Sequence, residues 1–133
     1  QGKRLSMEIE NGHIKNFAQA ISDSNPLWND EESASKGPYG TLIAPPTFLR
    51  SVPYDKPDLP FVNPFNRMLD GGSKWEYFQP VRAGDTITSF ARIADVFTRA
   101  GKIGPMLFTI LEIVYENQNS NKVAVQTSTM IAY

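Results

Sequence analysis

The sequence predicts an α+β fold, in which a curved antiparallel sheet wraps a helix in a single domain over residues 1–133. Three observations carry this prediction. Apolar residues at helical spacing come early, seven of the ten prolines fall between Pro38 and Pro64, and the second half is dense in β-branched and aromatic residues. Helical segments therefore precede a run of strands, which is an α+β order rather than the alternation of an α/β protein.

The chain begins with a short predicted strand and an amphipathic helix. The strand is LSMEIE, residues 5–10, and the helix is NGHIKNFAQAIS, residues 11–22. Asn11 is a suitable N-cap for this helix. Four apolar residues recur at i, i+3, i+4 and i+7, the spacing of one helix face: Ile14, Phe17, Ala18 and Ile21.

The proline-rich middle leaves room for only one short helix, PPTFLRSV at residues 45–52. Pro45 and Pro46 suit a first helical turn, where the N–H has no partner in any case. Pro53 ends the helix, and the chain from there to Pro64 must be an extended loop. A helix of about eight residues is only ~12 Å long. The sheet therefore encloses apolar space that loops, a partner or a substrate must fill.

Four long strands are predicted in the second half of the chain. They are SKWEYFQPV, DTITSFARIADVF, PMLFTILEIVYEN and KVAVQTSTMIAY, at residues 73–81, 85–97, 105–117 and 122–133. Residues 116–122, ENQNSNK, read as a hairpin turn, and RAGKIGP at 99–105 as a basic loop. In the last strand six residues share one face by their period of two: Val123, Val125, Thr127, Thr129, Ile131 and Tyr133.

The composition excludes several classes of site. The chain of 133 residues has no Cys and one His, which excludes disulfides, thiolate metal sites and His-rich metal sites. A net charge of −1 gives no reason to expect a nucleic-acid partner. No run approaches the ~18 apolar residues of a membrane span. A cytoplasmic protein without metal or cofactor is the expectation.

Four segments resemble one known family in order and spacing. They are FAQAISDSNPLW, GTLIAPPTFL, GGSKWEYFQPVRAGDTI and GKIGPMLFTILEIVYEN. Together they resemble the MaoC-like hydratases and dehydratases, and specifically their N-terminal, non-catalytic type. The resemblance implies a hot-dog fold. In active members, as the resemblance implies, an Asp and a His within an Asp-x-Asn-Pro-Leu-His loop act as general acid and base on a trans-2-enoyl-CoA.

Placed on this family pattern, the sequence lacks two parts of the machinery. Asp23 matches the catalytic Asp, but Trp28 stands where the His belongs, and an indole cannot accept a proton from water. The family polarises the thioester carbonyl with a backbone N–H at the start of the central helix. Here that position is Ala44-Pro45, and Pro45 has no N–H to give. The resemblance therefore implies a non-catalytic subunit with a vestigial Asp23.

The other candidate groups have structural explanations beside the functional ones. Asp23 before an Asn-Pro pair is typical of an Asx-turn, a purely structural role. His13 reads as a solvent-facing helix residue and Asp85 as a turn residue. Glu76 alternates with aromatic residues in a strand and reads as solvent-facing or as part of an interface.

The resemblance and the residues together suggest a substrate site. Its expected walls are Trp28, Thr47, Phe48 and Trp75, although Trp28 fits a core position equally well. Arg82, Arg99 and Lys102 are the candidates for the phosphates of coenzyme A, because Arg and Lys both suit phosphate. A solvated turn explains Arg99 and Lys102 equally well.

The function expected from the resemblance is that of an accessory subunit in lipid metabolism. It would pair with a catalytic MaoC-like subunit, as a heterodimer or heterotetramer, to hydrate trans-2-enoyl-CoA to 3-hydroxyacyl-CoA. Bulky acyl groups such as steroid side chains would suit the shortened helix. Two alternatives stay open: a self-sufficient homodimeric hydratase or acyl-CoA thioesterase using Asp23, and a non-enzymatic acyl-CoA-binding protein.

Overall fold

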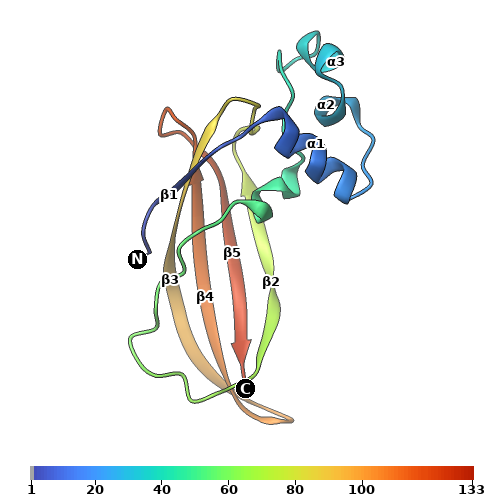
Figure 1. Cartoon of the computed structure of the whole chain (residues 1–133). Helices are drawn as coiled ribbons and strands as arrows, with labels where there is room; N and C mark the ends of the chain where they lie inside the picture. The colour runs from blue at the N-terminus through green and yellow to red at the C-terminus, as the bar shows by residue number, and fades with distance from the viewer. Residues whose placement is uncertain (1) are drawn as a thin grey trace.

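The computed structural model describes residues 2–133, which form one five-stranded antiparallel sheet accompanied by short helices (Figure 1). The elements follow in the order β1 (Leu5–Glu8), α1 (Asn11–Ala20), α2 (Pro26–Asn29), α3 (Glu31–Ser35), a 3-10 helix η1 (Pro46–Ser51), β2 (Met68–Tyr77), β3 (Thr86–Gly101), β4 (Gly104–Glu116) and β5 (Lys122–Ala132). The predicted α+β class and curved antiparallel sheet are confirmed.

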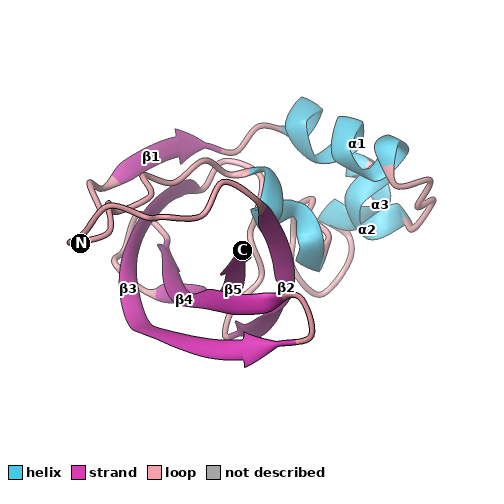
Figure 2. Ribbon diagram, turned by 90° about the horizontal axis from the view of Figure 1, so that it is seen from below, coloured by secondary structure: helices cyan, strands magenta, loops and turns pink. Residues whose placement is uncertain are grey.

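The strands lie in the order β1-β3-β4-β5-β2, so β1 and β2 form the two edges of the sheet. Consecutive hairpins join β3, β4 and β5, while β2 reaches its place beside β5 from earlier in the chain. Figure 2 shows the sheet curling around its concave face, with the chain that follows η1 crossing in front of it.

The concave face of the sheet carries the core, because alternate strand residues point inward. In β4 the inward residues Leu111, Ile113 and Tyr115 are each at most 1% exposed. They pack with residues of η1, of which Phe48 and Leu49 are 2% exposed. The core therefore lies between the middle strands and the short 3-10 helix.

The six β5 residues predicted on one face mostly lie on the convex side. Gln126 pairs with Ile113 in the register and shares its inward direction, and Ala124, Gln126 and Ala132 are buried. Val125 and Ile131 are only half-buried. The inward side of this strand is thus smaller and more polar than the outward side, which the alternation of residue types alone does not reveal.

The first helix is shorter than predicted. It spans Asn11–Ala20, and its N-cap is Glu10 rather than Asn11. Ile14 and Ala18 are fully buried as expected, but Ile21 lies beyond the helix and is 46% exposed. The helix stops because the next residue, Ser22, has a left-handed φ of 56°.

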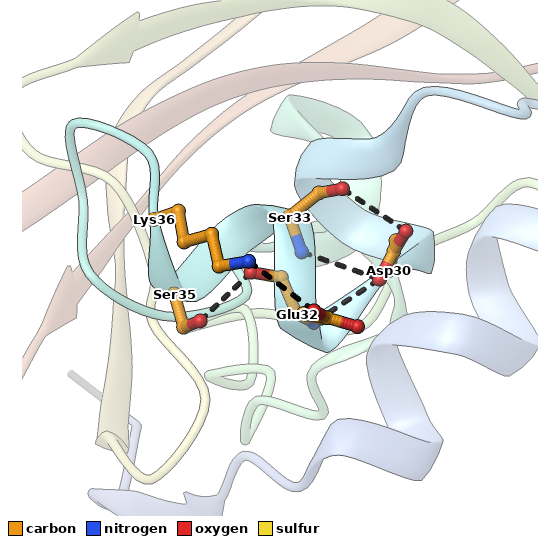
Figure 3. A network of polar contacts seen from close by, with 5 residues as sticks. All are labelled: Asp30, Glu32, Ser33, Ser35 and Lys36. Carbon is orange, nitrogen blue, oxygen red and sulfur yellow. Dashed lines mark hydrogen bonds and ion pairs between the residues drawn. The ribbon is translucent and has the colours of Figure 1, made fainter.

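Two further short helices follow that periodicity does not predict, α2 and α3. Asp30 caps α3: its Oδ1 accepts the N–H groups of Glu32 and Ser33, and its Oδ2 accepts the Ser33 hydroxyl (Figure 3). The hydrogen bonds from Ser33 are the main reason that the pKa of Asp30 lies below its usual value. No helix among residues 2–133 is long and apolar enough to cross a membrane.

The predicted central helix is a 3-10 helix of six residues, Pro46–Ser51, and the chain beyond it has no regular structure up to β2. We call residues 52–67 the roof loop, because they cross the concave face (Figure 2). Val52 and Pro57 are buried there, and the Ser89 hydroxyl donates to the Pro53 carbonyl over 2.7 Å. The prediction that a loop helps to fill the space left by the short helix is confirmed.

Several strand boundaries differ from the sequence-based ones. β2 spans Met68–Tyr77 rather than residues 73–81, and its register shifts between Asp70 and Ser73. This shift is a bulge at Gly71 and Gly72, where Gly72 has a φ of +107°. At the other hairpin the predicted basic loop is mostly strand, since β3 extends to Gly101 and β4 resumes at Gly104.

Phe48 gives a direct test of this core. We expect Phe48→Ala to lower the free energy of unfolding by ~3–5 kcal/mol, because it removes a buried ring that packs edge-on against Phe17 with centroids 5.5 Å apart. The adjacent Thr47 is exposed, so Thr47→Ala should change that free energy by less than ~0.5 kcal/mol. Urea unfolding measures both. Equal effects of the two substitutions would contradict the assigned packing.

Candidate functional site

The segment from Asp23 to Asn29 is a loop held by its own hydrogen bonds. Asp23 Oδ1 accepts the Asn25 N–H over 3.0 Å, which closes an Asx-turn. Asn25 Oδ1 then accepts the Leu27 N–H and caps α2. Asn29 Nδ2 donates to the carbonyls of both Asp23 and Asn25. The predicted Asx-turn at Asp23 is therefore present in the structure.

This loop is fastened to the rest of the chain by a short backbone bridge, which we call the 42–44/81–83 bridge. Ala44 N–H donates to the Val81 carbonyl over 2.8 Å and Ala83 N–H to the Leu42 carbonyl over 2.9 Å. Between them Ile43 donates to the Leu27 carbonyl over 3.1 Å. The loop, the segment before η1 and the turn before β3 are thus joined at one point.

A cavity of about 400 Å³ lies beside the bridge, and we call it the bridge cavity. It is walled by the loop, by the start of η1 and by the end of β2. Its lining residues are Leu27, Trp28, Tyr39, Ile43, Ala44, Pro45, Pro46, Leu49, Tyr77, Phe78, Gln79, Pro80 and Val81. This lining contains no carboxylate, imidazole, ammonium or guanidinium group, so it offers a mostly apolar site whose only ionisable side chains are Tyr39 and Tyr77.

Trp28 occupies this wall at the position where the family pattern has its His. Its indole Nε1 is buried and has no hydrogen-bond partner within residues 2–133. An unpaired buried donor is costly, typically by ~1–3 kcal/mol. Indole can donate from this nitrogen but cannot accept a proton. Trp28 therefore supplies shape and one donor, and it cannot act as a base.

Residues 44–46, at the start of η1, offer no N–H to a carbonyl in the bridge cavity. Ala44 has given its N–H to Val81, and Pro45 and Pro46 have none. The Phe48 N–H donates to the Pro45 carbonyl over 2.9 Å. Residues 44–46 therefore cannot polarise a thioester carbonyl at this position, and Thr47 is the first residue of η1 that has an N–H.

The other predicted wall residues are only partly assembled here. Trp75 is half-buried and stacks between Tyr77 and Tyr115, with ring centroids 5.8 Å from each. Phe48 lies in the core, and Thr47 is exposed. None of these three residues lines the bridge cavity, so their contact with substrate stays a prediction.

Tyr77 is one of the wall residues that the sequence reasoning missed. It lies two residues beyond Trp75 and thus on the same face of β2, where the two rings stack with an interplanar angle of 4°. The alternation in SKWEYF carried this signal. Tyr39 and Phe78 also line the bridge cavity, but no spacing in the sequence connects them to it.

The three predicted phosphate-binding residues do not form one group. Arg82 lies next to the bridge and lines a polar hollow beside the turn at 117–121. Arg99 and Lys102 lie at the far hairpin, beyond a 16-residue strand that spans ~50 Å along its path. Arg99 rests against Phe97, 5.1 Å from its ring centroid. One phosphate group cannot contact all three residues, because the strand separates them.

The remaining ionisable candidates take structural positions. Asp85 is 9% exposed, and its carboxylate accepts the Arg82 N–H and the Gln118 side-chain amide, as befits a turn residue. His13 Nδ1 accepts the Glu10 N–H at the start of α1. Glu76 is exposed, with Lys74 4.0 Å away. Within residues 2–133, no three side chains of the metal-binding types come together.

Comparison with known proteins adds a family. The family model described as FAS1-like, dehydratase domain region, matches residues 2–126. A UPF0336 protein of Streptomyces avermitilis is 33% identical over 99 residues, which cover 71% of this chain and 66% of that protein. A UPF0336 protein of Thermobifida fusca is 34% identical over 99 residues, 71% of this chain and 65% of that protein. The chain thus spans slightly less than two thirds of these relatives.

Solved structures share the fold over almost the whole chain. The ChsH1-ChsH2 complex from Mycobacterium tuberculosis matches with a TM-score of 0.81 and 18% identity, over 98% of this chain and 83% of that chain. The C-terminally truncated HadBC (3R-hydroxyacyl-ACP dehydratase) complex of the same organism matches with a TM-score of 0.76 and 20% identity, over 99% of this chain and 96% of that chain. A MaoC-like dehydratase from Rhodospirillum rubrum matches with a TM-score of 0.71 and 20% identity, over 99% of this chain and 91% of that chain. The expected hot-dog fold is confirmed.

Asp23 provides a test of the loop. We expect Asp23→Ala to lower the free energy of unfolding by ~0.5–1.5 kcal/mol, because the Asn25 N–H loses its acceptor. Asp23→Asn retains an oxygen acceptor and should stay close to the parent chain. Thermal and urea unfolding compare the two variants. If both are equally destabilised, the negative charge of Asp23 matters rather than its turn hydrogen bond.

Tyr115 predicts an alkaline limit to stability. Its burial, reinforced by Tyr54, raises its pKa well above the ordinary value of about 10. The folded chain therefore holds this proton where the unfolded chain loses it. The stabilising effect is complete below pH 10, and above that it is lost by up to ~1.4 kcal/mol per pH unit.

The absorbance of tyrosinate near 295 nm measures this effect. Of the five tyrosines, Tyr115 should ionise only as the fold opens, which adds a late step to the titration. Tyr115→Phe should remove that step alone. A titration of the parent chain that is complete before unfolding would show that Tyr115 is not shielded as described.

Proposed function

The chain belongs to the family of FAS1-like dehydratase domains, which has a MaoC-like hot-dog fold, and from this premise we propose that it is a non-catalytic subunit of a heteromeric hydratase. The complex would hydrate trans-2-enoyl-CoA to 3-hydroxyacyl-CoA or catalyse the reverse reaction. A second MaoC-like chain would supply the Asp–His pair and the N–H that polarises the thioester carbonyl.

The bridge cavity is the observation that carries this proposal. Hydration of an enoyl thioester needs a group that accepts a proton from water and a donor at the carbonyl oxygen. The cavity has Trp28 and Pro45 where the family pattern places these two groups, and its lining contains no ionisable side chain other than tyrosine. Two independent substitutions at one apolar cavity favour a role in lining the substrate site over a catalytic role.

The edge strand β2 supports the proposal of a partner. Over ten residues all but Trp75 are exposed, including Met68 at 52% and Tyr77 at 46%. A long exposed edge carries unpaired N–H and C=O groups, which favour pairing with another chain. The unpaired indole N–H of Trp28 also fits a site whose shell is completed from outside. Two of the structures with this fold are complexes of two named components.

The acyl group that we propose is bulky, such as a steroid side chain. The central helix is reduced to six residues of 3-10 helix, ~12 Å long. The roof loop does not fill all the remaining space, since a hollow of about 330 Å³ persists on the concave face next to β2. Space of this kind favours a wide substrate over a slender acyl chain.

A self-sufficient hydratase or thioesterase using Asp23 is the less favoured alternative. Asp23 is engaged in its own turn and does not line the bridge cavity. A non-enzymatic acyl-CoA-binding protein fits the apolar cavity equally well, because binding needs no base. The decisive difference between the two remaining functions is activity in the presence of a catalytic partner.

Co-expression with a chain that carries Asp-x-Asn-Pro-Leu-His tests the proposal. Alone, this chain should hydrate neither 2-octenoyl-CoA nor a 2-enoyl-CoA with a bulky polycyclic acyl group faster than the uncatalysed reaction. The co-purified complex should be active, and replacing the His of the other chain by Ala should lower kcat by ~10²–10⁴. Asp23→Ala in this chain should leave kcat within about twofold, since its carboxylate takes no part. The fall in absorbance near 263 nm, as water adds to the conjugated enoyl thioester, provides the readout.

Two outcomes would favour another function. Activity of the chain alone that disappears in Asp23→Ala would contradict the proposal and favour the self-sufficient enzyme. Binding of the thioester without turnover, with or without a partner, would favour the binding protein. The same assays with the acyl group on acyl carrier protein show which carrier the complex accepts.

A further inference from the structure

A second hollow lies on the concave face beside the edge strand β2, and we call it the concave-face pocket. Its volume is about 330 Å³. It is lined by Arg50, Tyr54, Met68, Leu69, Asp70, Ser73, Tyr115, Gln126, Ser128 and Met130. Unlike the bridge cavity, it combines an apolar floor of methionine and leucine with a set of hydroxyl, amide and guanidinium groups.

A chain of hydrogen bonds runs through the wall of this pocket. The Tyr115 hydroxyl donates to Gln126 Oε1 over 3.4 Å, and Gln126 Nε2 donates to Ser73 Oγ over 3.0 Å. Tyr115 is fully buried and Gln126 is 8% exposed, so their positions are fixed by packing. Ser73 accepts at the end of this chain and is itself exposed. Its own hydroxyl proton therefore remains available to a ligand.

Arg50 brings a positive charge to the same pocket. No carboxylate among residues 2–133 lies within 4.0 Å of its guanidinium, whereas five other basic residues have an acidic partner. Asp70 also lines the pocket, and its Oδ1 accepts the Gly72 N–H. Arg50 and Ser73 are thus donors without an assigned acceptor, which is what a site for a ligand oxygen requires.

The concave-face pocket and the bridge cavity adjoin each other through an aromatic ladder. Tyr77 lines the bridge cavity, Tyr115 lines the concave-face pocket, and Trp75 stacks against both. On the opposite side the adjacent residues Leu49 and Arg50 of η1 line one hollow each. The two hollows are therefore neighbours, with the Trp75 ring between them.

We propose that the concave-face pocket binds the distal end of an acyl group through an oxygen atom that accepts hydrogen bonds, and so selects oxygenated acyl groups over plain hydrocarbon ones. Arg50 and Ser73 would donate to this oxygen, and Gln126 would hold Ser73 in place. The role as an acyl site rests on the proposed function. The preference for an acceptor oxygen rests on the pocket alone and can be measured by binding without turnover.

Methionine methyl groups report on this binding in the whole chain. Met68 and Met130 line the pocket, whereas Met7 and Met106 lie outside it. The probes are three eight-carbon N-acetylcysteamine thioesters that end in a methyl, a hydroxyl or a carboxylate group. In the NMR spectrum of the ¹³C-methyl-methionine protein, the oxygenated probes should shift Met68 and Met130 and bind about tenfold more tightly than the plain one.

Matched variants locate the donors. Arg50→Met should remove most of the advantage of the carboxylate probe, and Ser73→Ala that of the hydroxyl probe. Lys74→Met removes an exposed basic residue of β2 that does not line the pocket, and should change neither. Arg50 and Ser73 are both exposed, so the fold should tolerate Arg50→Met and Ser73→Ala.

The results separate the two proposals. A larger advantage of the carboxylate identifies an acidic acyl end, and a larger advantage of the hydroxyl identifies an alcohol or carbonyl end. Equal affinity of the plain probe, or shifts confined to Met7 and Met106, would overturn the inference. A selective pocket without hydration by any complex would leave this inference standing and refute the proposed function, whereas hydration without selectivity would do the opposite.

Discussion

The 42–44/81–83 bridge is the contact on which the candidate site depends. It joins segments that are about forty residues apart in the sequence, and Ile43 extends the connection to Leu27 in the Asp-Asn-Pro loop. Each backbone bond contributes only ~1 kcal/mol net, and the bonds lie beside four buried residues, Leu42, Ile43, Ala44 and Val81. Without this bridge, the loop that carries Trp28 would not lie beside Pro45 and Pro46, and the three residues would not line one cavity.

The strands of the second half could be predicted because their periodicity is long and their turns are marked by Asn and Gly. The start of β2 could not, because Gly71 and Gly72 read as a break in the strand, although they form a bulge inside it. There a Cβ on Gly71 would lie 2.9 Å from the Thr129 side chain, a tertiary contact that only the folded sheet reveals. The helices α2 and α3 are too short for any period to appear.

The chemistry of the site was more predictable than its geometry. Trp28 cannot accept a proton and Pro45 has no N–H to donate, and both properties are visible in the sequence itself. The separation of Arg82 from Arg99 depends on where β3 runs. The contact between Tyr115, Gln126 and Ser73 depends on the pairing of β4, β5 and β2, so no local pattern announces it.

The roof loop has no regular structure, and its prolines help to keep it in place. Four of them, from Pro53 to Pro64, lie in this segment. A proline restricts the unfolded chain and can favour the folded state by ~0.4–1 kcal/mol where its backbone angles suit the fold. Four suitable sites would lower the conformational entropy of the unfolded chain enough to favour the folded state by roughly 2–4 kcal/mol. The cover over the concave face is therefore stiff before it packs, and it can lie over an open hollow without collapsing into it.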